Sequence, residues 1–259
     1  MEGIASVSRL SRKYVGQTIL DATDRQQRLI GFNQAVFSRS RVVCIGAGGL
    51  ISQIAPTLVR KGIGSLTILD DDVVEASNLN RQRFYSKDLG QNKAYALAKN
   101  LLAECVYTTL LTAYPLLLED AIDSGIDLSC DVAICGVDNN PARVAASKHF
   151  RRLKTPVIFT AVSADADHGY VFIQKPTGPC FGCLFPDAVD SRTYACPATP
   201  AIADILQAVG ALTVYGVDTC LMSRPREWTY RRLRLSNVDW DSGNEIEVRS
   251  DCSMMVCHK

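Results

Sequence analysis

The feature that most constrains the fold is a strand pattern, a glycine-rich turn and a helix pattern in immediate succession. Residues 41–46 (RVVCIG) form a short apolar run, the turn GAGGL follows, and apolar residues then recur at helical spacing to residue 61. Further strand patterns at 65–69, 131–135 and 156–161 come with an alanine-rich helix pattern at 91–104. Strands that alternate with helices pair in parallel, so we expect an α/β fold with a Rossmann-like, doubly wound, mostly parallel sheet.

The character of the sequence changes after residue 164. The runs YVFIQ and WTYRRLRL are typical of strands, and residues 201–217 are typical of one apolar helix. We therefore expect mixed C-terminal strands in the same sheet. Residues 1–40 show few strand patterns and have apolar residues at roughly helical spacing. The chain thus divides into an N-terminal helical segment, 1–40, and a single domain, 41–259.

Composition limits the choice of partner and compartment. Lys and Arg number 28 against 27 Asp and Glu, so the formal net charge of +1 is too small to attract nucleic acid or an anionic membrane. No run of about 18 uninterrupted apolar residues occurs, and the N-terminus lacks the apolar stretch of a signal peptide. We therefore expect a cytoplasmic protein with no nucleic-acid or membrane partner.

The glycine turn indicates a nucleotide without identifying it. Gly46, Gly48 and Gly49 let the backbone approach a phosphate at a helix N-terminus. The sixth position of the dinucleotide fingerprint GxGxxG is Ile51, where that fingerprint has a small residue. Asp70 ends the second strand pattern, where it would bond a ribose hydroxyl of NAD and ATP alike. A nicotinamide-dependent oxidoreductase, or an α/β protein of another function, therefore stays open on these residues.

Polar residues further along the chain favour ATP. Arg81 and Lys93 could face the β- and γ-phosphates, which the departure of pyrophosphate requires and hydride transfer does not. Asp138 and Asn139 follow a strand pattern, at the edge of the sheet where ligands bind, and a carboxylate there suits Mg²⁺. The candidate nucleotide-binding residues are Gly46, Gly48, Gly49, Asp70, Asp72, Asn78, Arg81, Gln82, Lys93, Asp138 and Asn139.

Four ordered blocks, GAGGL, DDDVVEASNLNRQ, GQNKA and VDNNPAR, resemble the ubiquitin-activating enzyme family, whose bacterial members include ThiF, MoeB and HesA. The resemblance runs from about residue 24 to the C-terminus. It implies that 41–259 is a ThiF-type adenylation domain, which uses ATP and Mg²⁺ to adenylate the C-terminal glycine carboxylate of a ubiquitin-like or sulfur-carrier protein. It also implies a homodimer, and a conjugating enzyme or a sulfur donor as a further partner.

The resemblance assigns roles to individual residues. Asp70 would hold the ribose, Arg81 and Lys93 would surround the triphosphate with Asn78, and Asp138 would hold Mg²⁺. Arg25, in DRQQRL, matches an arginine that reaches across a dimer into the partner's ATP site. Taken singly, these residues also fit surface charges or caps. A non-catalytic half of a heterodimer is the remaining alternative, and the intact set argues against it.

The cysteines fall into two groups. Cys44, Cys105, Cys130, Cys135 and Cys220 lie in apolar segments and are predicted to be core residues. Cys180 and Cys183 have the CxxC spacing of half a zinc site, which Cys252 and Cys257 would complete. The resembling family usually has CxxC at the second pair, so His258 is an alternative to Cys257. Reduced thiols or a redox pair remain the alternative to zinc.

Cys196 lies in SRTYACPATP, a polar, proline-containing stretch before the apolar helix, and is predicted to be on an exposed loop. In the resembling family a cysteine at this place can take the activated protein as a thioester. Only a thiolate with a lowered pKa would react efficiently, so an ordinary loop cysteine is the alternative. The candidate catalytic residues are Arg25, Arg81, Lys93, Asp138 and Cys196.

Overall fold

The computed structural model describes residues 13–15, 18–20, 22–188, 201–222, 224–236, 246–252, 254 and 256. Seven strands of these residues form one sheet in the order β5-β4-β3-β6-β7-β8-β9. β3 (Arg41–Ile45) lies between β4 (Ser65–Leu69) and β6 (Val132–Cys135), with β5 (Leu110–Tyr114) and β7 (Val157–Val162) outside them. These five strands are parallel.

The two C-terminal strands reverse direction. β8 (His168–Gln174) is antiparallel to β7, and β9 (Tyr230–Arg234) is antiparallel to β8. The predicted doubly wound, mostly parallel sheet with mixed C-terminal strands is therefore confirmed. The chain crosses from one side of β3 to the other between β5 and β6, so a crevice is expected at the carboxyl ends of β3 and β6.

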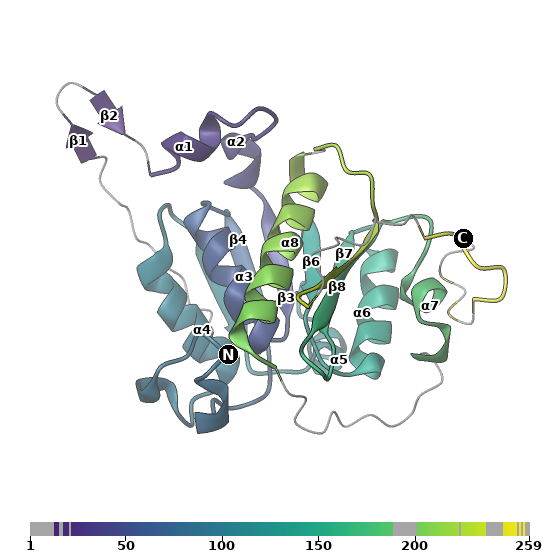
Figure 1. The fold of residues 1–259 in the computed structure, drawn as a ribbon. Coiled ribbons are helices and arrows are strands. Elements are labelled where there is room, and N and C mark those ends of the chain that lie inside the picture. Colours follow the sequence, from purple (N-terminus) through teal and green to yellow (C-terminus); the bar gives the residue numbers. More distant parts are fainter. Residues whose placement is uncertain are drawn as a thin grey trace.

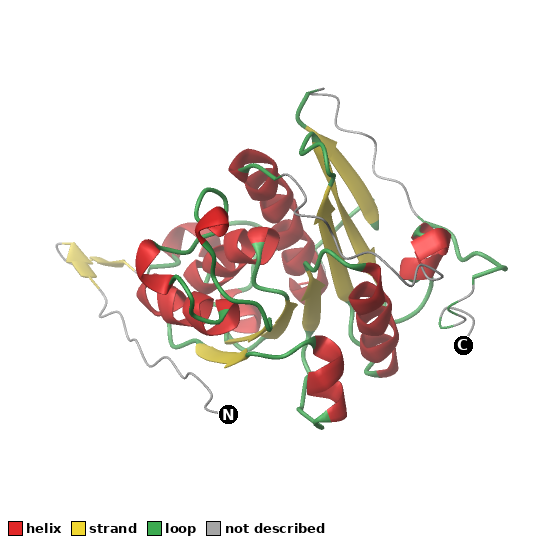
Figure 2. Ribbon diagram, turned by 90° about the horizontal axis from the view of Figure 1, so that it is seen from below, coloured by secondary structure: helices red, strands yellow, loops and turns green. Residues whose placement is uncertain are grey.

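Helices cover both faces of the sheet (Figure 1), and the view from below shows the strands between the helices (Figure 2). α3 (Gly49–Arg60), α4 (Lys93–Leu101) and α8 (Ala203–Met222) share one core, and α5 (Leu118–Asp123), α6 (Asn140–Arg152) and α7 (Phe181–Leu184) share the other. Single 3₁₀ turns are η1 (Ala76–Asn78), η2 (Ser86–Asp88), η3 (Leu102–Glu104) and η4 (Pro186–Ala188). The predicted core cysteines Cys44, Cys105, Cys130 and Cys135 are buried, and Cys220 is half-buried.

Within the described residues, α8 is the one helix long and apolar enough to cross a membrane by length and composition. In the structure it packs against α3, β7 and β8. Half of its 20 residues are buried. Gly216 lets it lie close to the sheet, because a Cβ there would be 3.1 Å from Cδ1 of Ile173. This is the environment of a core helix.

The N-terminal segment is only partly helical, which differs from the expectation for 1–40. β1 (Lys13–Val15) and β2 (Thr18–Leu20) form an antiparallel pair that projects from the body of the molecule (Figure 1). Strands of three residues are too short to show an alternating pattern. α1 (Asp24–Gln27) and α2 (Gln34–Phe37) supply the expected helical turns, and Oδ1 of Asn33 caps α2 by accepting from the Val36 N–H at 3.1 Å.

Candidate functional site

A cavity of 580 Å³ lies at the carboxyl ends of the parallel strands. Its walls come from residues that follow β3, β4, β5 and β6, and from the first turns of α3, α4 and α6. This is the crevice expected where the strand order reverses. All the residues predicted to bind the nucleotide line it: Gly46, Gly48, Gly49, Asp70, Asp72, Asn78, Arg81, Gln82, Lys93, Asp138 and Asn139.

The glycine turn brings backbone N–H groups to this cavity. Gly46 has a φ of +95°, a conformation that glycine adopts without strain, and its N–H donates to the Leu69 carbonyl at 2.7 Å. α3 begins at Gly49, and no side chain caps its N-terminus. The N–H groups of its first turn are therefore available to an anion, which the helix dipole also favours.

Ile51, the departure from the dinucleotide fingerprint, packs against Gly136 at the end of β6. Ile51 is fully buried, and a Cβ on Gly136 would lie 2.8 Å from its Cγ1. The fingerprint obtains close packing of helix on strand from a small residue on the helix. Here the glycine that directly follows β6 makes the room instead, so the large residue does not separate α3 from the sheet.

Asp70 ties the glycine turn to the end of β4. Its Oδ2 accepts from the Ala47 N–H at 2.6 Å, and its Oδ1 accepts from the Asp72 N–H at 2.9 Å. Burial raises the pKa of Asp70 to about 6, against the opposing effect of these donors and of Lys93. A hydrogen bond from a ribose hydroxyl would give this desolvated carboxylate a further partner.

Lys93 is held at the cavity wall by the residue before it. Asn92 caps α4 by accepting from the Tyr95 N–H at 3.1 Å, and its Nδ2 donates to the Asp70 carbonyl at 2.8 Å. The Lys93 Nζ lies 2.8 Å from Oδ2 of Asp72. The lysine side chain is 11% exposed and that of Asp72 is 67% exposed. A phosphate would thus reach a shielded cation whose present partner is free to move into solvent.

The loop after β4 carries three more of the predicted residues. Asn78 is buried, and its Oδ1 accepts from the Glu75 N–H at 3.0 Å. Arg81 lines the cavity, and its Nη1 donates to the Ser77 carbonyl at 2.6 Å. Among the described residues, Oε1 of Gln82 is buried without a hydrogen-bond partner. A buried acceptor of this kind at a cavity wall would be satisfied by a donor on a ligand.

Asp138 and Asn139 occupy the turn between β6 and α6. Oδ1 of Asn139 caps α6 by accepting from the Ala142 N–H at 2.9 Å, so this oxygen already has a partner. Asp138 is exposed and makes no hydrogen bond or ion pair with any residue that the structure describes. Its carboxylate oxygens are free to bind a ligand.

Sequence reasoning missed several residues of the cavity. Leu117 and its neighbours follow β5, and Arg143, Tyr170 and Phe185 reach the cavity from α6, β8 and just beyond α7. Burial raises the pKa of Tyr170 to about 12, so its hydroxyl stays protonated. Arg143 had a signal, since it stands in the first helical turn after Asp138. The remaining residues have no such sequence signal, because their position at the cavity depends on how the later strands return to the sheet.

Two predicted catalytic residues are not in the cavity as described. Arg25 lies on α1, is exposed and does not line the cavity. Cys196 lies outside the described residues.

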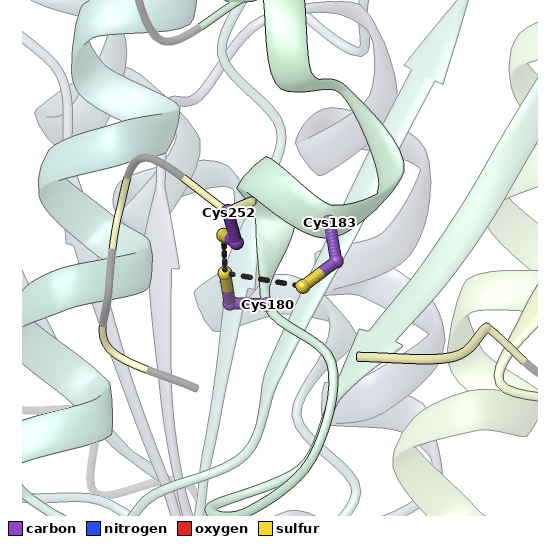
Figure 3. A group of neighbouring side chains, drawn as sticks. All are labelled: Cys180, Cys183 and Cys252. Carbon is purple, nitrogen blue, oxygen red and sulfur yellow. Dashed lines mark hydrogen bonds between the residues drawn. The ribbon is translucent and has the colours of Figure 1, made fainter. Parts of the chain in front are cut away.

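Cys180, Cys183 and Cys252 form a buried cluster (Figure 3). The Cys180 sulfur lies 3.8 Å from that of Cys183 and 3.4 Å from that of Cys252. In a tetrahedral site with Zn–S bonds of about 2.3 Å, the sulfur atoms are about 3.8 Å apart. The three thiols therefore lie close enough together to act as ligands of one metal ion. Burial raises the pKa of the Cys180 thiol. Cys257 and His258 lie outside the described residues.

The fold and the cavity define a Rossmann-type nucleotide-binding protein. The chain belongs to the ThiF family, whose model matches residues 20–253. It is 31% identical over 204 residues to the SAMP-activating enzyme E1 of Haloferax volcanii, covering 72% of each chain. It is 34% identical over 194 residues to the sulfur carrier protein adenylyltransferase of Thermus thermophilus, covering 70% of this chain and 71% of that one.

Solved structures show the same fold. The crystal structure of Escherichia coli MccB with ATP matches 85% of this chain and 68% of its own, with a TM-score of 0.71 and 21% identity.

Proposed function

We propose that this protein uses ATP and Mg²⁺ to adenylate the C-terminal glycine carboxylate of a ubiquitin-like or sulfur-carrier protein. One observation carries the proposal. A free carboxylate (Asp138), two cations (Arg81 and Lys93) and an uncapped helix N-terminus surround a single cavity at the reversal of strand order. Relatives named as adenylyltransferase and activating enzyme support it.

The residues of the cavity fit ATP carried with Mg²⁺. Its volume of 580 Å³ lies within the range of small-molecule sites, about 300–1,000 Å³. Lys93 and Arg81 supply positive charge for the triphosphate, and Asp70 supplies an acceptor for the ribose. Asp138 offers the oxygen ligands that Mg²⁺ prefers. Bound there, Mg²⁺ would neutralise charge on the departing pyrophosphate.

In the proposed reaction, a carboxylate oxygen of the substrate forms a bond to the α-phosphorus of ATP. The bond from that phosphorus to the oxygen bridging to the β-phosphate breaks, and pyrophosphate leaves. The product is an acyl-adenylate, whose AMP is a far better leaving group than oxide. Lys93 and Arg81 would stabilise the charge that moves onto pyrophosphate, and the N–H groups of α3 would orient the phosphates.

The alternatives explain less of the cavity. A nicotinamide-dependent oxidoreductase uses the glycine turn and Asp70, but it gives Arg81, Lys93 and Asp138 no common task. A non-catalytic scaffold predicts loss of the charged set, which lines one cavity here.

The proposed assembly is a homodimer in which Arg25 of each subunit enters the cavity of the partner subunit. Arg25 is exposed and lies outside its own cavity, and the adjacent apolar residues Leu29 and Ile30 are 52% and 96% exposed, so both are available for contact with a partner. α8 runs from Leu206 at the cavity to Met222, whose sulfur accepts from the Asn33 N–H at 3.1 Å. A two-fold axis across the middle of α8 would bring each α1 towards the partner's cavity.

The further proposals concern the roles of the cysteines, the cellular location and the partners that take the product. The proposed structural metal is zinc, held by Cys180, Cys183 and Cys252 with Cys257 as fourth ligand. Cys196 would attack the acyl carbon as a thiolate, so that a C–S bond forms, the C–O bond to AMP breaks and AMP leaves. The proposed location is the cytoplasm, and a conjugating enzyme or a sulfur donor would take the product.

ATP–pyrophosphate exchange tests the proposed function. We expect exchange that depends on a cognate protein with a glycine-ended tail, and absence of exchange with that partner would refute the proposal. Asp138→Ala should abolish exchange, because it removes the carboxylate that lines the cavity in the turn after β6 and has no partner among the described residues.

Subunit mixing tests the dimer. Arg25→Ala and Asp138→Ala should each be inactive, whereas a re-equilibrated equal mixture should regain about a quarter of wild-type activity. Half of the dimers are then mixed, and one of the two sites in each has both residues. No recovery after verified subunit exchange would contradict the proposal that Arg25 acts in the partner's site.

A further inference from the structure

Arg143 lines the cavity but has no part in the proposed reaction. It stands in the first turn of α6 and lines the cavity together with Asp138. Its Nη2 donates to the Val137 carbonyl at 2.8 Å, and its Nη1 donates to Oδ1 of Asn140 at 3.1 Å. One of these bonds attaches to the residue before Asp138 and the other to a residue just after it. The guanidinium therefore spans the turn that carries the free carboxylate.

We propose that Arg143 is a positioning residue, which fixes Asp138 for binding the divalent cation of metal–ATP; the proposal rests on the proposed function. The carboxylate of Asp138 has no partner among the described residues, so its own side chain does not fix it. The start of the turn is held by the Gly136 N–H, which donates to the Ile45 carbonyl at 3.0 Å, and its end is held by the Asn139 side chain that caps α6. Arg143 restrains the middle.

Geometry, more than charge, makes Arg143 suited to this role. Each terminal nitrogen already donates to the turn, and Nε is buried with no hydrogen-bond partner in the described chain. Leaving a buried donor unpaired costs free energy. The guanidinium therefore keeps its two bonds to the turn although its Nε–H stays unpaired. Lysine keeps the positive charge but cannot make two bonds in a fixed planar fork. An Arg-to-Lys change therefore separates the two properties.

The test is calorimetric titration of ATP into the full-length protein without any protein substrate, with Mg²⁺ or with EDTA. We expect Arg143→Lys and Arg143→Gln to raise the dissociation constant of Mg–ATP about tenfold, the usual effect of losing a group that orients a metal ligand. In EDTA both variants should match wild type within about twofold. Repeating the titration with Mn²⁺ should give the same ranking.

Arg151→Gln is the matched control, on the same helix. Arg151 also donates from Nη1 and Nη2, to the carbonyls of Pro176 at 2.8 Å and Gly178 at 3.0 Å, and it does not line the cavity. This variant should lower the unfolding temperature without changing Mg–ATP affinity. An equal loss of Mg–ATP affinity in Arg151→Gln would overturn the proposal, because a general weakening of α6 would explain both.

Three other results would also overturn it. Wild-type affinity for Mg–ATP in both Arg143 variants would show that the fork is not needed, and it would leave the proposed function standing. Restoration of binding by Lys alone would show that charge, not geometry, is what matters. If the wild-type protein bound no ATP with or without Mg²⁺, the proposed function and this proposal would fall together.

Discussion

Gly136→Ala offers a quantitative test of how α3 is seated on the sheet. The added Cβ would lie 2.8 Å from Cγ1 and 2.9 Å from Cδ1 of Ile51, both closer than real Cβ atoms approach a neighbour. Ile51 is fully buried, so it has no solvent into which to turn. Overpacking of a filled core costs about 1–3 kcal/mol. For a domain of this size, about 2 kcal/mol lowers the unfolding temperature by roughly 4–8 °C.

A double-mutant cycle isolates this contact. Ile51→Ala alone should cost about 2–5 kcal/mol, because it leaves a cavity under α3. It also removes both atoms that the new methyl group would meet, so Gly136→Ala should cost little or nothing in that background. The expected coupling is at least about 1 kcal/mol in favour of the double variant. Urea unfolding followed by far-ultraviolet circular dichroism gives all four free energies of unfolding.

A second glycine of the same cavity serves as control. A Cβ on Gly48 would meet nothing closer than Nε2 of Gln82, at 4.0 Å, so Gly48→Ala should cost less than about 1 kcal/mol. Additive effects of Gly136→Ala and Ile51→Ala, within about 0.5 kcal/mol, would refute the proposed packing of helix on strand.

Three further predictions concern the acid, the metal and the thiol. Because burial raises the pKa of Asp70 from 3.8 to about 6, the folded protein without nucleotide binds this proton more tightly than the unfolded chain does. The stabilisation, about 3 kcal/mol, is full below about pH 4 and lost as the pH rises through 6; urea unfolding should show this slope in wild type and lose it in Asp70→Ala. Wild type should carry one zinc per chain by elemental analysis and Cys180→Ser should carry little, so equal contents would argue against the cysteine site. Cys196→Ala should keep pyrophosphate exchange and lose any thiol-sensitive adduct with the substrate protein on a denaturing gel; an unchanged adduct would place it on another residue.

The central strands could be predicted from the sequence because strands that are buried on both faces consist of short runs of apolar residues. β3 and β4 begin and end where the patterns at 41–46 and 65–69 place them, apart from the final glycine of the first. β5 is an edge strand, and Leu110 at its start is 50% exposed, so its pattern is weak. α6 buries small residues, Ala142 and Ala146, on a polar helix, which leaves little periodicity to detect.

The candidate site could be predicted to a similar degree, for a topological reason. Asp70, Lys93 and Asp138 each stand just after a parallel strand or at the start of the next helix, and the carboxyl ends of parallel strands meet at one edge. Tyr170 and Phe185 reach the same cavity only because β8 returns antiparallel to β7. The antiparallel return of β8 depends on the packing of the whole sheet, so no local sequence pattern predicts it.

The short helix α7 is part of both the cavity wall and the cysteine cluster. Cys180 and Cys183 lie on either side of Phe181, which lines the cavity, and the third sulfur comes from Cys252, 72 residues further along the chain than Cys180. The turns that follow β3 and β4 are held in place by the sheet, whereas the wall at α7 depends on how these thiols are held together. Under the proposed metal assignment, removing the metal from this cluster should loosen the cavity wall at Phe181, and returning it should tighten that wall.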